Sequence, residues 1–236
     1  MYATEKINDL DYMALTTNRN GGKVVQVSTV KGSMDYVDRL RIQFAENDKT
    51  NLQRAIWPLS NPMPNQTDGS KRTWELSVES ADLVTYLRAL DEKNCAMAKE
   101  RCKEWFKKEM TDVELRGMYT PIIKENGNVK IKVQCSDKPT RIMVVDADKG
   151  LTVAPTVGSD KDLVKGARCL LVANTPGLWF MRFQWGMSFT ATDILVWKPR
   201  VMTGINAFTF HPSTTLKTHD VQDPVGDIED MAVESE

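Results

Sequence analysis

The chain has 236 residues, of which 41% are hydrophobic and 27% are charged. This is the composition of a globular protein that can bury a core, and it excludes collagen-like and largely disordered chains. No apolar run approaches the roughly 20 residues that a membrane-spanning helix needs, and residues 1–6 lack the basic-then-apolar layout of a signal peptide. We therefore expect an intracellular protein that is not secreted and has no membrane partner.

Positive and negative charges are divided unequally along the chain. The last 17 residues contain seven carboxylates and no Lys or Arg, whereas residues 1–219 carry 31 basic and 25 acidic side chains. A positive body joined to a negative tail is typical of chains whose tail is an interaction arm, although a merely solubilising end has the same composition. The tail carboxylates are Asp220, Asp223, Asp227, Glu229, Asp230, Glu234 and Glu236.

Cysteines and histidines give no sign of a metal or catalytic site. The four cysteines contain no C-x-x-C pair, and the only two histidines lie in the polar stretch near the end of the chain. This spacing indicates buried reduced thiols and predicts no zinc site and no disulfide framework. Because no nucleophile motif or phosphate-binding loop is present either, we expect neither an enzyme nor a cofactor.

Short extended segments dominate the chain. Val129–Gln134 alternates strictly, with apolar side chains on one face and Lys130, Lys132 and Gln134 on the other, as in a half-buried strand. The segments that we predict as strands are 12–17, 23–30, 40–44, 74–78, 119–123, 129–134, 141–145, 168–173 and 178–198.

One long helix is predicted over residues 81–108. Ser80 is a plausible N-cap and Asp82 favours the first turn. Apolar residues recur at helical spacing from Leu83 to Trp105, so one face of this helix should cover a core.

Many short strands with one inserted helix predict a mainly β fold. A five-stranded OB-type barrel fits best, because closing the sheet removes exposed edges and leaves a groove for aromatic and basic side chains. We expect a single domain over residues 1–210, with the long helix inserted and extra N-terminal strands, followed by a flexible acidic tail over residues 211–236.

The densest aromatic stretch runs from Leu178 to Trp197. Read as one strand, it places Trp179, Met181, Phe183 and Trp185 on one face. Such rings could fill a barrel core or could form a surface on which bases stack.

The order of several segments resembles that of the replication single-stranded-DNA-binding proteins of T-seven-like bacteriophages. These segments are Thr73–Val78 leading into the long helix, Pro121–Ile123 with the Asn126-Gly127 turn and the Lys130/Lys132 strand, Arg141–Asp146 with Gly150, Val157–Ser159, and finally Trp179 with Ile194–Val196. The resemblance implies an OB-fold protein with an acidic tail, located in the host cytoplasm. Members of that family end in an aromatic residue, whereas this chain ends in Glu236, and its first seventy residues match poorly.

We therefore expect sequence-independent binding and protection of single-stranded DNA in viral DNA replication and recombination. The phosphate contacts are expected among Arg41, Lys130, Lys132, Arg141, Arg182, Lys198 and Arg200. Base stacking is expected among Tyr119, Trp179, Phe183, Trp185 and Trp197.

Partners beyond DNA are expected through the tail, which would compete for the DNA groove and recruit replication proteins such as a polymerase or a helicase/primase. The sequence also leaves open whether the chain forms a homodimer. The alternative is a non-enzymatic viral interaction or assembly protein that uses the aromatic strand as a protein interface.

Overall fold

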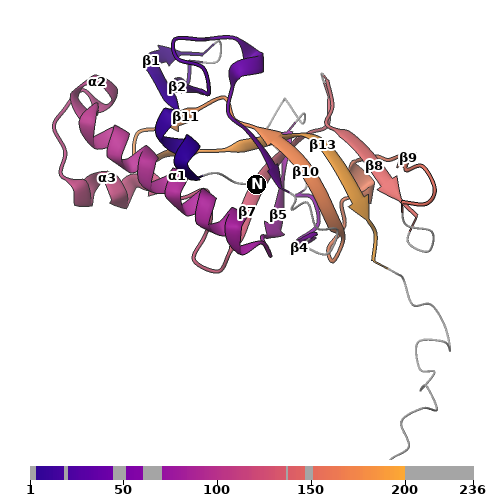
Figure 1. Cartoon of the computed structure of the whole chain (residues 1–236). Helices are drawn as coiled ribbons and strands as arrows, with labels where there is room; N and C mark the ends of the chain where they lie inside the picture. The colour runs from indigo at the N-terminus through magenta and orange to yellow at the C-terminus, as the bar shows by residue number, and fades with distance from the viewer. Residues whose placement is uncertain are drawn as a thin grey trace, which may run out of the picture. The chain divides into compact units, whose positions relative to one another are not determined.

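The computed structural model describes residues 4–18, 21–44, 52–60, 71–136, 138–146 and 151–199. All of them fall within the compact unit Met1–Arg200 (Figure 1). The expected acidic tail and Arg200 lie outside the described residues.

Five strands close into a barrel, which confirms the predicted mainly β, OB-type fold. Around the barrel the order is β10-β4-β5-β7-β13, and β13 returns to β10; only the β7–β13 pair is parallel. A five-stranded partly open barrel with this mixed pairing is the OB architecture. The barrel strands are β4 (Gln53–Ala55), β5 (Lys71–Ser77), β7 (Asn128–Gln134), β10 (Arg168–Asn174) and β13 (Phe189–Trp197).

Three further strands extend the barrel sheet at its two sides. One of them pairs with β10, and the other two continue outward from β13. They are β3 (Arg41–Phe44), β8 (Arg141–Val145) and β9 (Thr156–Val157).

Alternation along β7 fixes which side chains reach the surface. Val129, Ile131 and Val133 are buried, whereas Lys130 and Lys132 are exposed, as the sequence predicts. The barrel core therefore dictates that both lysines point outward on the same face.

A second sheet of five strands is built from the N-terminal hairpin, from the connection between β10 and β13, and from a short strand that precedes β7 in the chain. Its order is β1-β2-β11-β12-β6. The strands are β1 (Asp11–Thr17), β2 (Lys23–Ser28), β6 (Tyr119–Thr120), β11 (Leu178–Phe180) and β12 (Trp185–Met187).

The predicted single strand from Leu178 onward is wrong. The chain reverses over residues 181–184, where the Met181 amide donates to the Gln184 carbonyl (2.8 Å), and β11 then pairs antiparallel with β12. Because Phe180 lies directly opposite Trp185, these two rings share one face and Trp179 lies on the other.

The α-helices are inserted in the chain between the second and third barrel strands, β5 and β7. The hydroxyl of Ser80 accepts from the Leu83 amide, so the predicted N-cap is confirmed, and Leu83, Leu87 and Leu90 are fully buried. The predicted helix over 81–108 is interrupted at Arg101, which is not helical, and ends at Lys107, which is left-handed. The helices are α1 (Ala81–Glu100), α2 (Cys102–Phe106), α3 (Asp112–Met118) and the 3-10 helices η1 (Thr4–Asp9), η2 (Tyr36–Asp38) and η3 (Asp160–Asp162).

An aromatic core joins the second sheet to these helices. Trp105 and Phe106 of α2 pack edge-on against Phe180, with ring centroids 5.7 Å and 5.4 Å away. Figure 1 shows α1, α2 and α3 together on this side of the molecule, with β8 and β9 at the opposite end. Within the described ranges, no helix is long and apolar enough to span a membrane.

Candidate nucleic-acid interface

A pocket of about 500 Å³ lies on the outer face of the barrel, where β5, β7 and the start of β13 meet the β11–β12 hairpin. We call it the ring pocket, because the indole of Trp179 forms one wall. Its lining is otherwise apolar side chains, three hydroxyl-bearing residues and three lysines: Thr73, Thr120, Pro121, Ile122, Lys124, Lys130, Lys132, Trp179, Met181, Met187, Ser188 and Phe189.

Local backbone pairing places Trp179 in this pocket. Its partner across the hairpin is Gly186, and a Cβ at that position would come within 3.2 Å of the indole and 2.7 Å of the Thr120 carbonyl oxygen. A glycine opposite an aromatic residue lets the ring lie across the strand pair. The hairpin thus presents Trp179 toward the barrel lysines.

The three lysines differ in their partners. Lys124 donates to the Glu75 carboxylate (2.7 Å), which also accepts from Asn128. Burial works to raise the pKa of Glu75, but these hydrogen bonds outweigh it, so that the pKa is lowered and the carboxylate stays ionised. Lys130 and Lys132 form no ion pair within the described part of the chain.

The surroundings of Lys132 disfavour its charged form. Desolvation lowers the pKa of Lys132, and the nearby charge of Lys71 lowers it further. Two cations close together without a carboxylate repel each other, and an anion such as a phosphate would relieve that repulsion.

The tip of the β11–β12 hairpin extends the ring pocket with exposed apolar groups. Met181 and Phe183 are each 70% exposed, and the Arg182 guanidinium lies 4.9 Å from the centre of the Phe183 ring. A ring partly covered by a cation is a surface on which a base can stack. The structure therefore brings together Lys130, Lys132, Trp179, Arg182 and Phe183 of the predicted site residues.

Two predicted stacking residues belong to the core instead. Trp185 is fully buried, and its indole N–H donates to the Leu115 carbonyl (3.0 Å). Tyr119 packs 4.5 Å from Trp185, and its hydroxyl donates to the Asp91 carboxylate and accepts from Asn94. Neither ring is presented to a ligand, so we remove both from the candidate site.

Buried Asp91 holds this end of the core together. Its carboxylate accepts from Tyr119 and from the backbone amides of Ile122 and Ile123. Burial raises the pKa of Asp91 to about 6, against the opposing effect of these hydrogen bonds. The loop that lines the ring pocket is thus tied to helix α1.

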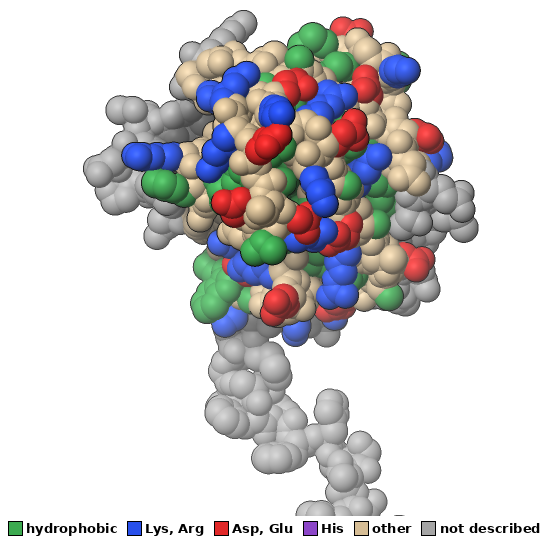
Figure 2. All heavy atoms as spheres, turned by 90° about the vertical axis from the view of Figure 1, so that its left-hand side faces the viewer, with side chains coloured by type: hydrophobic (Ala, Val, Ile, Leu, Met, Phe, Trp, Pro, Cys, Tyr) green, Lys and Arg blue, Asp and Glu red, His purple; other side chains and the backbone are tan. Residues whose placement is uncertain are grey.

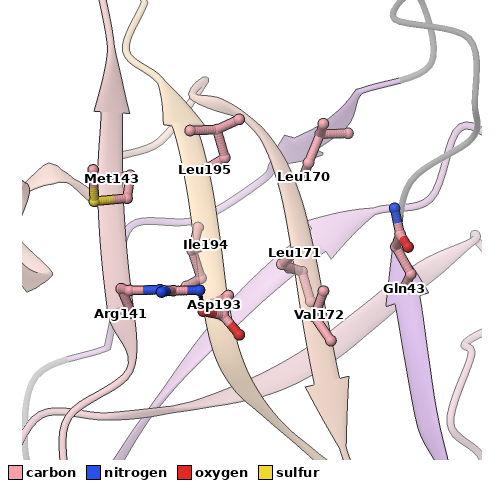
Figure 3. A pocket seen from close by; sticks show the side chains of 9 residues that line it. All are labelled: Gln43, Arg141, Met143, Leu170, Leu171, Val172, Asp193, Ile194 and Leu195. Atoms are coloured by element: carbon pink, nitrogen blue, oxygen red, sulfur yellow. Dashed lines mark ion pairs between the residues drawn. The ribbon is translucent and has the colours of Figure 1, made fainter. Parts of the chain in front are cut away.

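Other predicted cations lie away from the ring pocket. Arg141 forms an ion pair with Asp193 above a shallow apolar hollow of about 290 Å³ on the outer face of β3, β10, β13 and β8 (Figure 3). Lys198 pairs with Asp162 at 2.8 Å. Arg41 is exposed on β3, and Trp197 is half-buried at the end of β13.

A second, polar pocket beside the ring pocket contains cations that the sequence analysis missed. It has a volume of about 460 Å³ and includes Arg39, Lys71 and Lys138 together with the ring of Tyr36. No periodic pattern marks Tyr36 or Lys138, because both lie in connections rather than in strands. Lys138 lies just after β7 in the chain, whereas only the fold brings Tyr36 to the same pocket.

The face that carries the helices differs from the two pockets in its charge. Figure 2, viewed from the left-hand side of Figure 1, shows Lys and Arg side chains interspersed with Asp and Glu side chains. A mixed surface of this kind attracts polyanions poorly. Among the described residues, no group of three or more His, Cys, Asp or Glu could hold a metal ion.

Solved structures of bacteriophage proteins are similar to this chain, although only distantly. The single-stranded-DNA-binding protein from bacteriophage Enc34 in complex with single-stranded DNA is 11% identical, over 81% of this chain and 98% of that chain, with a TM-score of 0.42. The same protein in another structure is 12% identical over 90% and 99%, with a TM-score of 0.41. The single-stranded-DNA-binding protein gp2.5 encoded by bacteriophage T7 is 13% identical over 70% and 90%, with a TM-score of 0.42.

TM-scores of this size leave fold and function to be argued from the chain itself. Comparison with curated proteins finds no match. One family model matches residues 66–208, which is more than half of the chain and contains every residue of the ring pocket. The chain therefore belongs to this family of unknown function (DUF5871).

Proposed function

We propose that this protein binds single-stranded DNA without sequence preference, in viral DNA replication and recombination. The observation that carries the proposal is the ring pocket, in which Lys130 and Lys132, unpaired within the described residues, flank Trp179. Cations for phosphates and a ring for an exposed base are the two ingredients that such binding needs.

The shape of the ring pocket favours a single strand over a duplex. Its volume of about 500 Å³ and its apolar walls suit an unstacked base. Bases in a duplex are stacked and paired, so they cannot enter unless the duplex opens. Because Trp179 offers only a ring face, every base can stack on it, and little sequence preference follows.

Fluorescence titration with oligothymidine tests the proposal. Stacking on Trp179 should quench its emission, and a single-stranded competitor should reverse the quench where an equal amount of duplex does not. Trp179→Phe should lose most of the quench while it retains binding. If oligothymidine changes neither the emission nor the anisotropy of a labelled strand at about 50 mM salt, the proposed function is excluded.

The seven tail carboxylates from Asp220 onward are proposed to compete with DNA for this cationic surface and, once displaced, to recruit replication proteins. The tail lies outside the described residues. Deleting residues 220–236 should tighten DNA binding, most strongly at low salt. Equal affinities of the full-length and truncated chains at about 50 mM salt would argue against this regulation.

Exposed Met181 and Phe183 favour one second candidate, an interaction or assembly protein that uses the hairpin tip as a protein interface. Met181→Ser/Phe183→Ser would then abolish self-association in sedimentation experiments and leave DNA binding unchanged. The DNA-binding proposal expects the reverse, because Phe183 would contact bases.

A further inference from the structure

The polar pocket continues from the ring pocket along the same strands. On β5 the lining passes from Thr73 in the ring pocket to Lys71 in the polar pocket, and on β7 it passes from Lys132 to Gln134. Each step is two residues, about 7 Å along a strand, which is the next position on the same face. A ligand that follows β5 and β7 on this face can therefore leave one pocket and enter the next.

The cations of the polar pocket are available for an anion. Within the described part of the chain, Arg39, Lys71 and Lys138 form no ion pair, and Arg39 Nε is buried without a hydrogen-bond partner. Lys138 has a positive φ of 83°, which is costly for a residue with a side chain. The Gln134–Thr140 backbone hydrogen bond (2.9 Å) closes the turn that holds it there.

The walls of the polar pocket differ from those of the ring pocket. Thr190 offers a hydroxyl group to the polar pocket, where Thr140 and Thr192 already donate theirs to the backbone carbonyls of Ala191 and Val172. The ring pocket instead presents Ile122, Met187 and other apolar groups. Hydroxyls and cations suit phosphate and sugar oxygens, and apolar walls suit bases. The two pockets are therefore complementary to different parts of one nucleotide chain.

Tyr36 supplies the polar pocket with its own ring. The side chain is 54% exposed, and the Arg39 guanidinium lies 5.0 Å from the ring centre. Asn174 donates to the Tyr36 hydroxyl and fixes the ring relative to β10. Arg39 and Tyr36 lie outside the range matched by the family model, so this part of the surface comes from the N-terminal segment of the chain.

We infer that the polar pocket is a second subsite for the same DNA strand, in which Arg39, Lys71 and Lys138 hold backbone phosphates and Tyr36 stacks one base. This inference rests on the proposed function. The DNA strand would run from the β11–β12 hairpin over β5 and β7 to η2. Short oligonucleotides would be held by the ring pocket alone, and longer ones by both pockets.

The experiment compares oligothymidines of about 4 and about 16 nucleotides, the range of site sizes that OB-type barrels cover. Arg39→Ala/Lys138→Ala should bind the short strand within about twofold of wild type and the long strand about tenfold more weakly. Its salt dependence with the long strand should fall by about 1.4 in log–log slope, which corresponds to two lost phosphate contacts. The matched control, Arg88→Ala/Lys99→Ala, removes two exposed charges from α1 and should leave both affinities unchanged.

Ring and charge contributions are separated by two further variants. Tyr36→Leu should weaken binding of the long strand at least fivefold, and Tyr36→Phe should not. Circular dichroism and thermal unfolding of each variant check that the fold is retained.

The inference is overturned if Arg39→Ala/Lys138→Ala binds the long strand like wild type while Lys130→Ala/Lys132→Ala weakens it, and the proposed function would then still stand. Absence of binding by wild type excludes the proposed function itself. Saturable binding of thymidine monophosphate that needs Arg39 and Lys138, with unchanged binding of the long strand, would assign the pocket to a free nucleotide and also overturn the inference.

Discussion

Trp179 is the residue on which base recognition depends in this account. Stacking of a base on an aromatic ring contributes about 1–3 kcal/mol, so Trp179→Ala should weaken oligothymidine binding about 5- to 150-fold. Anisotropy of a labelled oligonucleotide measures this without relying on Trp emission. Trp57→Ala is the matched control, because that ring is 56% exposed but lies beside Lys165, outside the ring pocket. A Trp179→Ala affinity within twofold of wild type would rule out stacking there.

Asp91 gives a prediction for stability against pH. Its pKa rises from 3.8 to about 6 on folding, so between these values the folded state binds more protons than the unfolded state. The contribution of Asp91 to stability is therefore complete below about pH 4 and is lost as the pH rises through 6. Asn at this position does not titrate. Between pH 4 and pH 7 the difference in the free energy of unfolding should therefore shift by up to about 3 kcal/mol in favour of Asp91→Asn over wild type.

Denaturant unfolding at several pH values measures this difference. Other carboxylates, such as Glu75 with its lowered pKa, titrate in both proteins and cancel in the comparison. A difference that stays constant from pH 4 to pH 7 would show that Asp91 does not titrate as described.

At the residue scale, alternation correctly predicted which side chains of β7 point outward. It placed Lys130 and Lys132 outward on β7. It failed for Trp185, because the turn at residues 181–184 reverses the chain and exchanges the faces. Tyr36 could not be predicted, since a residue in a connection has no periodicity that relates it to a strand.

Among the elements, the β11–β12 hairpin depends on Gly177 at its start. Gly177 has a φ of 120°, and a Cβ there would overlap the carbonyl oxygen of Val25. Gly177→Ala should therefore destabilise the protein through backbone strain and through steric overlap with a neighbouring strand. Gly32 also has a positive φ (75°), but nothing lies within 4 Å of a Cβ at that position.

This pair makes the test specific. Gly32→Ala should cost about 1–2 kcal/mol from its backbone conformation alone, and Gly177→Ala about 1–3 kcal/mol more. Thermal unfolding measures both. Equal losses in the two variants would mean that the close approach of β2 to Gly177 is absent in solution.

Most elements of the barrel could be read from the sequence, whereas their interruptions could not. The apolar stripe of α1 continues to Trp105, so periodicity gives no warning that the helix breaks at Arg101. Strand β4 has only three residues, Gln53–Ala55, which is too short for an alternating pattern, although it closes the barrel between β5 and β10.

At the scale of the whole molecule, the two sheets have separate tasks. The barrel provides a rigid face with outward lysines, and the second sheet, packed on the helices, holds the hairpin that carries Trp179. The site exists only where these two parts meet. Composition predicted a positive body, but only the antiparallel pairing of β5 with β7 brings Lys71 and Lys132 close together.

The most direct test of this account is the salt dependence of oligothymidine binding by wild type and by Lys130→Ala/Lys132→Ala, with Arg88→Ala/Lys99→Ala as control. Each phosphate contact contributes about 0.7 to the slope of log K against log salt concentration for a single strand. The account predicts a slope smaller by about 1.4 for Lys130→Ala/Lys132→Ala and an unchanged slope for the control. Identical slopes in all three proteins would contradict it.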